Sequence, residues 1–253
     1  MQNHPLLEAR DLVKKYNGRA VVDRLNFEVR SGEIVGLLGR NGAGKTTSFR
    51  IAIGMIDAEG GQVLFDGMDV THLPMYKRAQ LGMGYLSQEP SVFQRLTVEQ
   101  NLLAILETMR HLNRTARAAA ARQLIEQFGL QAQAHQEART LSGGERRKLE
   151  IARAMITNPK LIFLDEPFSG VDPIAVQGLQ REILSLRSRG IAILLTDHNV
   201  RETLRVTDRS YIIDQGRHLA NGTPTELINN PLVRETYLGN AFEGHEFADR
   251  RIN

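Results

Sequence analysis

The residue pattern with the clearest chemistry is a glycine-rich octapeptide that ends in a lysine and a threonine. Its members are Gly39, Arg40, Asn41, Gly42, Ala43, Gly44, Lys45 and Thr46, and Thr47 completes the predicted nucleotide-binding set. Glycines let the backbone N–H groups of such a loop converge on one anionic ligand. Lys45 is then expected to reach the β- and γ-phosphates, and the Thr46 hydroxyl to coordinate Mg²⁺. The pattern predicts binding and hydrolysis of ATP with Mg²⁺; a glycine-rich turn without a ligand is the alternative.

A pair of adjacent carboxylates, Asp165 and Glu166, ends an apolar run over residues 161–164. Buried strands often end in an acidic residue, so the pair alone is weak evidence. Together with a phosphate-binding loop, the pair meets the needs of phosphoryl transfer. Asp165 is expected to hold Mg²⁺, directly or through water, and Glu166 to orient or deprotonate the water that attacks the γ-phosphate.

A third pattern is the pentapeptide Leu141-Ser142-Gly143-Gly144-Glu145. Ser142 is a good N-cap residue, and Glu145 falls at the N3 position of a capping box. The two glycines leave backbone N–H groups uncovered at the start of a helix, and such a helix start attracts anions. A capped turn without a ligand is the alternative for the pentapeptide alone.

With these motifs in this order, the chain resembles the ATP-binding subunits of ABC transporters from about Leu6 to Gly239. In that family two subunits meet head to tail, and ATP lies between the phosphate loop of one copy and the segment of the other that contains Ser142, Gly143 and Gly144. The resemblance implies a homodimer that works with separate transmembrane permease subunits and has no nucleic-acid partner. It also implies a cytoplasmic location, peripheral on the cytoplasmic face of the inner membrane.

The resemblance assigns roles to four further residues. Tyr16 is similar to the aromatic residue that stacks on adenine, and Gln88 to the glutamine that touches the metal and the attacking water. His198 resembles the switch histidine on the γ-phosphate, and Asp172 a residue near the partner's phosphate loop. Simpler explanations for single residues are a core tyrosine, a solvated glutamine, a structural histidine and an Asp-Pro turn. The implied catalytic residues are Glu166, His198 and Gln88, and the implied metal ligands are Thr46, Gln88 and Asp165.

Short apolar runs alternate with helical patterns, which predicts an α/β fold with a largely parallel sheet. Strands are expected at residues 34–38, 62–65, 82–86, 161–164, 191–196 and 210–213. Apolar alternation over 22–29 predicts an antiparallel strand with one wet face. The fold class is therefore a P-loop NTPase core with a mixed sheet, an N-terminal antiparallel β layer and, as the ABC family implies, an inserted helical subdomain.

The helical subdomain is expected at about residues 89–157, because helical periodicity occurs at 98–109 and 115–128. Two short helices are expected near the end. Residues 223–226 have a capping-box spacing with proline at N1, and residues 230–239 begin with Asn-Pro and end with Gly. One nucleotide-binding domain is thus predicted over 1–240, followed by a polar tail over 241–253.

Composition limits the setting of this chemistry. The 32 Lys and Arg residues against 29 Asp and Glu give a net charge of +3, which offers no argument for a nucleic-acid partner. The absence of cysteine suits a reducing cytosol. Residues 1–12 lack the apolar core of a signal peptide, and no apolar stretch approaches the roughly 18 residues that span a bilayer. We therefore expect membrane association through a partner.

Three segments narrow the resemblance within the family. They are residues 165–173, residues 196–204, and residues 222–226 together with 237–239. They are similar to segments of the ATPases that drive lipopolysaccharide export, so this is the predicted process. Branched-chain amino-acid importer ATPases share the third of these segments and are the second hypothesis. A soluble ABC ATPase outside transport is the third, and a single cassette without a basic stripe disfavours it.

Phe93 is a candidate partner contact in the segment 89–96, which comes directly after Gln88 and also contains Arg95. Apolar anchors with charged rims are typical of protein interfaces, so we expect Phe93 to bind a coupling helix of a membrane subunit. Packing of Phe93 in the core is the alternative.

Overall fold

The computed structural model of the protein describes residues 4–87, 89 and 91–239. Its strands are β1 (Leu7–Tyr16), β2 (Arg19–Val29), β3 (Ile34–Leu38), β4 (Gly60–Phe65), β5 (Met68–Asp69), β6 (Met83–Leu86), β7 (Leu161–Asp165), β8 (Ala192–Thr196), β9 (Arg209–Asp214) and β10 (Arg217–Gly222). Its α-helices are α1 (Lys45–Ile53), α2 (Met75–Gln80), α3 (Val98–Leu106), α4 (Arg114–Gln127), α5 (Gly143–Met155), α6 (Pro173–Ser188), α7 (Val200–Val206), α8 (Pro224–Asn229) and α9 (Pro231–Val233). Short 3-10 turns span Gln131–Gln133 and Ala138–Thr140, and a π-helical turn spans Arg234–Leu238.

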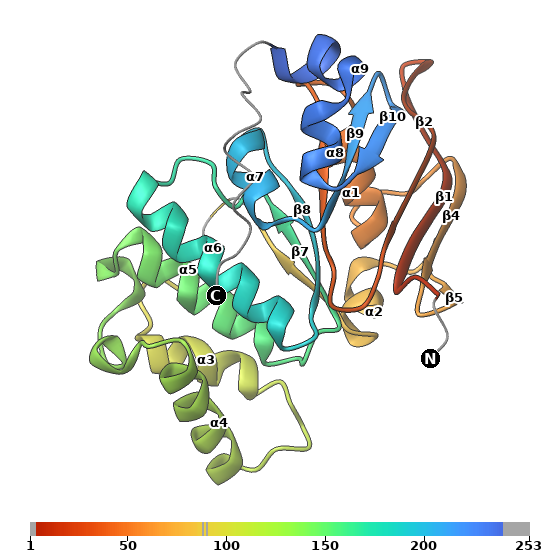
Figure 1. Cartoon of the computed structure of the whole chain (residues 1–253). Helices are drawn as coiled ribbons and strands as arrows, with labels where there is room; N and C mark the ends of the chain where they lie inside the picture. The colour runs from red at the N-terminus through yellow and green to blue at the C-terminus, as the bar shows by residue number, and fades with distance from the viewer. Residues whose placement is uncertain (1–3, 88, 90, 240–253) are drawn as a thin grey trace.

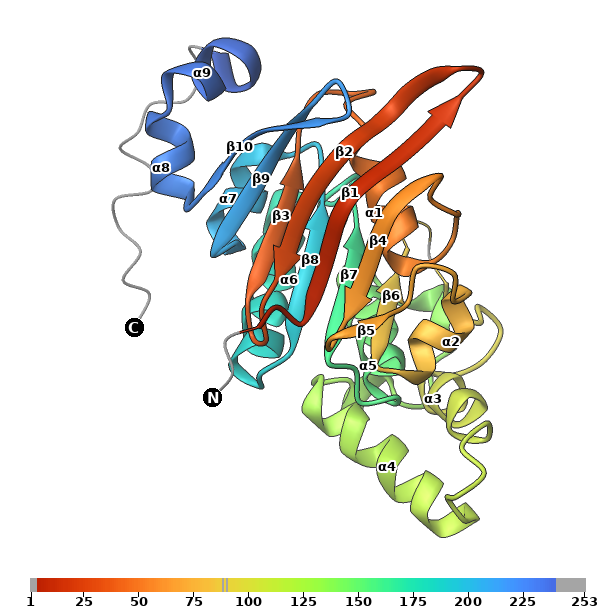
Figure 2. The same cartoon turned by 90° about the vertical axis from the view of Figure 1, so that its right-hand side faces the viewer.

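Two sheets form the body of the molecule (Figure 1 and Figure 2). The first has the order β2-β1-β4-β5 and is antiparallel throughout. The second has the order β10-β9-β3-β8-β7-β6, with parallel pairs from β9 to β6 and the antiparallel hairpin β9–β10 at one edge. The predicted α/β class, the mixed sheet and the antiparallel N-terminal layer are confirmed. All seven predicted strands are present, with small differences at their ends.

Strand β7 shows why the central strands are apolar along their whole length. All of its residues are buried. Ile162 and Leu164 join the core cluster that includes residues of α3, α4, α5 and α6, whereas Leu161 and Phe163 join the cluster of α1 and the first sheet. Successive side chains of a strand point to opposite faces, so a strand that is covered on both faces is apolar at every position.

Helices α3 and α4 pack against each other on the side of the molecule remote from the first sheet (Figure 1). The side chain of Thr97 accepts from the Gln100 N–H, and the Gln100 side chain accepts from the Thr97 N–H, so a capping box starts α3. Helix α3 ends at Leu106, before the predicted end at residue 109, and the Thr108 hydroxyl donates to the Ile105 carbonyl there at 2.7 Å. These helices supply the inserted helical part of the predicted fold class.

The two short C-terminal helices have the predicted start and stop signals. Thr223 and Glu226 form a capping box with Pro224 at N1 of α8, and the Asn230 side chain caps α9. Gly239 ends the last turn with φ 66°, a left-handed conformation that favours glycine. Among the described residues, no helix combines the length and the apolar character that crossing a bilayer requires. The predicted tail 241–253 lies outside the described residues.

A buried arginine fastens α2 to the end of α1. Arg78 is 1% exposed, and its guanidinium donates to the carbonyls of Ile51 (2.9 Å), Ala52 (2.7 Å), Thr71 (2.9 Å) and Leu73 (2.8 Å). Burial lowers the pKa of Arg78 to about 10. The last carbonyls of a helix have no partner within the helix and carry a partial negative charge, so this cation satisfies and stabilises the end of α1.

We predict that Arg78→Met lowers the free energy of unfolding by about 3 kcal/mol, because the substitution leaves buried carbonyls without donors. Urea denaturation measures this change. The exposed neighbour Lys77 offers a matched control, and Lys77→Met is expected to change stability by less than about 0.5 kcal/mol. Equal stabilities of the two variants would show that the Arg78 contacts contribute nothing.

Candidate active site

The loop from Gly39 to Gly44 connects the buried strand β3 to α1, as the octapeptide predicts. Gly39 and Gly44 have φ values of 154° and 100°, which side chains rarely adopt. A Cβ atom on Gly39 would lie 2.2 Å from the Ile213 carbonyl oxygen, and one on Gly44 would lie 2.5 Å from that of Val21. Both glycines are therefore required by the fold of the loop, which brings its backbone close to β2 and β9.

Lys45 lies at the first position of α1 and folds back over the loop. Its ammonium group donates to the carbonyls of Gly39 (2.6 Å) and Arg40 (3.1 Å). Burial lowers the pKa of Lys45, while the negative charges of Glu166 and Asp197 act in the opposite direction. The ammonium group has carbonyl partners that a phosphate can replace, and its position over the loop suits a phosphate ligand. Thr46 and Thr47 come next on the first turn and are half-buried.

Asp165, the last residue of β7, is 6% exposed. Its carboxylate accepts a long hydrogen bond of 3.4 Å from the Tyr85 hydroxyl. Burial raises the pKa of Asp165, and the positive charge of Arg50 opposes this shift. A largely buried carboxylate with a single long neutral hydrogen bond among the described contacts suits a cation ligand.

Glu166 comes directly after β7 and has φ 45°, an unusual value for a residue with a side chain. Its N–H donates to the Thr196 carbonyl at 2.7 Å, which fixes the backbone at the end of β8. The imidazole Nδ1 of His198 lies 3.5 Å from a Glu166 carboxylate oxygen. The fold thus brings together Glu166 and His198, two of the three predicted catalytic residues; the third, Gln88, lies outside the described residues.

The Ser142 motif forms the predicted capping box at the start of α5. The Glu145 N–H donates to the Ser142 hydroxyl oxygen (3.3 Å), and the Ser142 N–H donates to the Glu145 carboxylate (2.8 Å). A Cβ atom on Gly143 or Gly144 would meet nothing within 4 Å. Within the described part of this chain, therefore, nothing requires glycine at these positions, and the backbone of the helix start is open to a second molecule.

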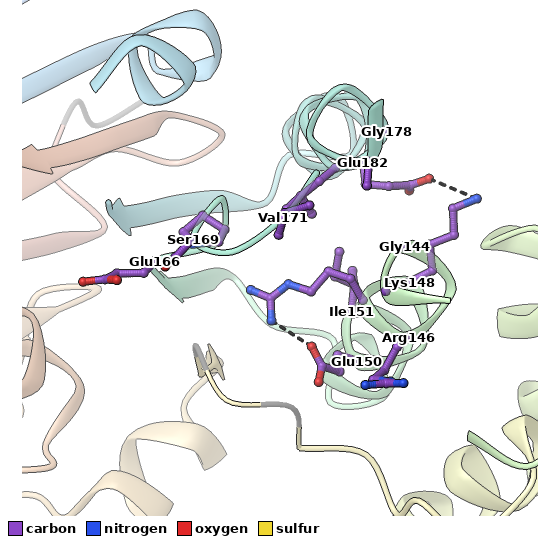
Figure 3. Close-up of a pocket in the computed structure, with 15 residues that line it drawn as sticks. Gly144, Arg146, Lys148, Glu150, Ile151, Glu166, Ser169, Val171, Gly178 and Glu182 are labelled. Atoms are coloured by element: carbon purple, nitrogen blue, oxygen red, sulfur yellow. Dashed lines mark hydrogen bonds and ion pairs between the residues drawn. The ribbon is translucent and has the colours of Figure 1, made fainter. Parts of the chain in front are cut away.

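A cavity of about 350 Å³ separates the start of α5 from the segment after Glu166 and from α6 (Figure 3). Gly143 and Gly144 line one side, and Ser169 and Val171 line another. The Glu166 side chain points away from this cavity in Figure 3. Glu166 and the start of α5 thus both line the cavity, but the Glu166 side chain is not directed into it.

Three further predicted contact residues, Tyr16, Asp172 and Phe93, are exposed. Tyr16 ends β1 and is 48% exposed, which excludes the core-tyrosine alternative, and stacking on adenine stays a prediction. Asp172 precedes α6, and its side chain accepts from the Ala175 N–H at 3.0 Å, so it has a local role as a helix cap. Phe93 is 44% exposed, and therefore the core alternative for it is wrong.

Sequence reasoning missed two buried acids near these motifs. Asp197, directly before His198, is fully buried. Glu150 on α5 is 4% exposed and accepts from the Ser91 N–H (2.9 Å) and from Arg147 (2.8 Å), and Arg147 also donates to the Ser87 carbonyl (3.1 Å). Glu150 shares its side of α5 with Arg147 and Arg153, three residues before and after it, so the helical pattern gives no signal that this acid is buried.

A strand–loop–helix phosphate site, acids at the end of a parallel strand and a remote glycine-rich helix start define an ATP-binding cassette. A family model described as ABC transporter matches residues 22–169. The chain belongs to the ABC transporter family.

Known proteins are similar in sequence to this chain over nearly its whole length. The lipopolysaccharide export system ATP-binding protein LptB of Haemophilus influenzae is 49% identical over 238 residues, which cover 94% of this chain and 99% of that protein. LptB of Escherichia coli K12 is 49% identical over 236 residues, covering 93% and 98%. A solved ATP-binding cassette of an ABC transporter in its ADP conformation has a TM-score of 0.83 at 27% identity, covering 93% of this chain and 99% of that chain. The chain is an ATPase that binds ATP.

Proposed function

We propose that this protein is the ATP-hydrolysing motor subunit of an ABC transporter that exports lipopolysaccharide from the inner membrane. The likeness to LptB proteins over more than nine-tenths of both chains carries the proposal. It favours export over the branched-chain amino-acid importer and over a soluble ATPase. In this proposal the chain is peripheral on the cytoplasmic face of the membrane and works with separate permease subunits.

In the proposed site, the loop Gly39–Gly44 and Lys45 bind the phosphates, and Tyr16 stacks on adenine. Glu166 takes a proton from the attacking water as that water approaches the γ-phosphate. His198 contacts the γ-phosphate from the end of β8. The carboxylate of Glu166 and the ring of His198 are adjacent, so one group can orient the other.

The residues present fit a magnesium ion. Thr46, Asp165 and Gln88 would hold it, and when bound it would neutralise charge on the β- and γ-phosphates. Among the described residues, no group of three or more His, Cys, Asp or Glu side chains could hold a metal. Magnesium is usually bound by one or two protein carboxylates together with substrate phosphates and water, and the buried Asp165 supplies one such carboxylate.

The proposed hydrolytic unit is a head-to-tail homodimer. The open backbone at Gly143 and Gly144 supports it, because these N–H groups and the Ser142 hydroxyl can then contact the γ-phosphate of ATP held by the partner. Asp172 would lie near the partner's phosphate loop. A ligand shifts an equilibrium only through differential affinity, so ATP favours the closed dimer and ADP the open one. This cycle of closing and opening would drive the permease.

Reconstitution tests the proposed cargo. The chain, together with the permease pair of a lipopolysaccharide exporter, is placed in vesicles that contain lipopolysaccharide, and ATP-dependent release of the glycolipid is measured. Release that requires ATP and this chain is the expected result. Stimulation of its ATPase activity by a branched-chain amino-acid permease pair, with none by the exporter pair, would contradict the proposal.

Phe93 is the proposed anchor for a permease subunit. The buried Asn101 fixes the backbone of Phe93. The Asn101 side chain accepts from the Phe93 N–H (2.8 Å) and donates to the Phe93 carbonyl (3.0 Å). The guanidinium of Arg153 stacks on the ring at 4.6 Å. An exposed aromatic ring on such a rigid support loses little entropy when a partner covers it, so it suits a docking anchor.

Phe93→Ala is therefore expected to weaken co-purification with the permease pair by at least about tenfold, with ATP affinity unchanged. Leu232→Ala removes a side chain of similar exposure, 46%, on the C-terminal helices and serves as the control. Undiminished co-purification of the Phe93 variant would disprove the anchor.

A further inference from the structure

The buried carboxylate of Asp197 links two loops of the site. It lies between β8 and α7, in the loop that carries His198, and its side chain is 0% exposed. One carboxylate oxygen accepts from the Phe168 N–H at 2.8 Å, and the other accepts from the Asn199 N–H at 2.8 Å. Phe168 belongs to the segment between Glu166 and Asp172. One side chain therefore holds the backbone of both loops.

Helix capping does not explain this carboxylate. Helix α7 has its own cap, because the Asn199 side chain accepts from the Glu202 N–H at 3.3 Å. Burying a carboxylate is costly, and burial raises the pKa of Asp197 against the two N–H bonds that lower it. The free-energy cost of burying the carboxylate has to be offset by another contribution. The contact that Asp197 adds is the one between the His198 loop and the segment from Glu166 to Asp172.

The link begins where the sheet ends. Strands β7 and β8 pair as far as Asp165 and Thr196, and the Glu166 N–H donates to the Thr196 carbonyl at 2.7 Å. Asp197 directly follows β8, and its side chain reaches across to Phe168. Phe168 is itself 3% exposed and packed in the core, so the far end of the link is anchored. The pairing of the two strands is thus continued into their loops by one side chain.

We propose that Asp197 is a positioning residue that makes the His198 loop and the segment from Glu166 to Asp172 move as one unit. The inference rests on the proposed function of the site. In the proposed dimer, His198 contacts the γ-phosphate in its own chain, and Asp172 lies near the phosphate loop of the partner. When the γ-phosphate is lost from one nucleotide site, the His198 loop moves. Asp197 then transmits this movement to the segment that faces the other nucleotide site.

Asp197→Asn tests this role, because the amide keeps the shape of the side chain but its nitrogen cannot accept a hydrogen bond. One of the two N–H links is lost. We expect kcat of the purified chain to fall about tenfold, while KM for ATP changes by less than about threefold, since Asp197 acts on Lys45 of the phosphate loop only through its charge. Thr203→Val is the control: Thr203 is fully buried on α7, and its hydroxyl has no hydrogen-bond partner in the described part of the chain. This variant should keep kcat within about twofold.

A double-mutant cycle with His198→Ala separates positioning from a general structural effect. If Asp197 acts through the His198 loop, the Asp197→Asn/His198→Ala chain is no slower than His198→Ala alone. A kcat for Asp197→Asn within about twofold of the wild type, losses that multiply in the double variant, or an equal loss in Thr203→Val would each overturn the inference. Failure of the proposed function looks different, because the wild-type chain itself would then neither hydrolyse ATP nor pair in its presence.

Discussion

Replacing Glu166 with glutamine is expected to slow ATP hydrolysis at least about 100-fold and to leave ATP affinity close to that of the wild type. The amide has almost the same shape as the carboxylate, so the φ of 45° and the bond to Thr196 can persist. It cannot take a proton from water. Measurement of phosphate release and of nucleotide binding on the same preparation separates the two effects.

Glu59→Gln is a suitable control, since Glu59 is an exposed acid whose ion pair with Lys14 at 3.6 Å lies on the surface. Its turnover should equal that of the wild type. If the Glu166 variant hydrolysed ATP at the original rate, another group would have to accept the proton.

Gly144→Asp is expected to abolish ATP-dependent pairing and to lower turnover by at least about 100-fold without unfolding the chain. A Cβ atom at Gly144 meets nothing within 4 Å, so the folded monomer has room for the side chain. An acid near a helix start is favourable to the helix itself. In the dimer, the new carboxylate would face the phosphates of the partner's ATP, and like charges would repel. The variant should therefore lose activity and keep its stability. Thermal unfolding measures the stability, and phosphate release measures the activity.

Gly178 on α6 provides the comparison for that variant, because a Cβ atom there also meets nothing within 4 Å. Gly178→Asp is expected to keep pairing and turnover. If the Gly144→Asp chain pairs at the same ATP concentrations as the wild-type chain, the start of α5 does not contact the partner's nucleotide.

The elements around the motifs could be predicted because local signals and burial agree there. Strand β3 is apolar at every position, since both faces are covered, and the glycine loop and Lys45 come directly after it. The capping boxes at Ser142 and Thr223 depend on residues three apart, so they can be identified without knowledge of the fold.

Other elements have no such local signal. Strand β1 is interrupted by register shifts between Ala9 and Leu12 and by Asp11 at φ 46°, so its side chains do not alternate regularly and the apolar pattern does not predict it. The Asp172-Pro173 pair has the composition of a turn, yet in the structure it caps α6 and supplies its first residue. The same residue types occur in turns and at helix starts, and the residues C-terminal to them decide which of the two forms.

The buried charges were beyond sequence reasoning for a different reason. Arg78 stands beside the exposed Lys77, and Asp197 stands beside the half-exposed His198. Neither composition nor periodicity distinguishes a buried charge from an exposed one, because its cost is offset by backbone groups far away in the sequence. For Arg78 these are the carbonyls of Ile51 and Ala52, and for Asp197 the N–H of Phe168.

The most direct test of the account is the molar mass of the Glu166→Gln chain in solution, measured by light scattering with and without magnesium and ATP. A monomer has a mass of 28.3 kDa. We expect the monomer mass without nucleotide and twice that mass at saturating ATP, with one ATP bound per chain. A chain that binds ATP at full occupancy and still has the monomer mass would contradict the shared nucleotide site on which the proposed motor depends.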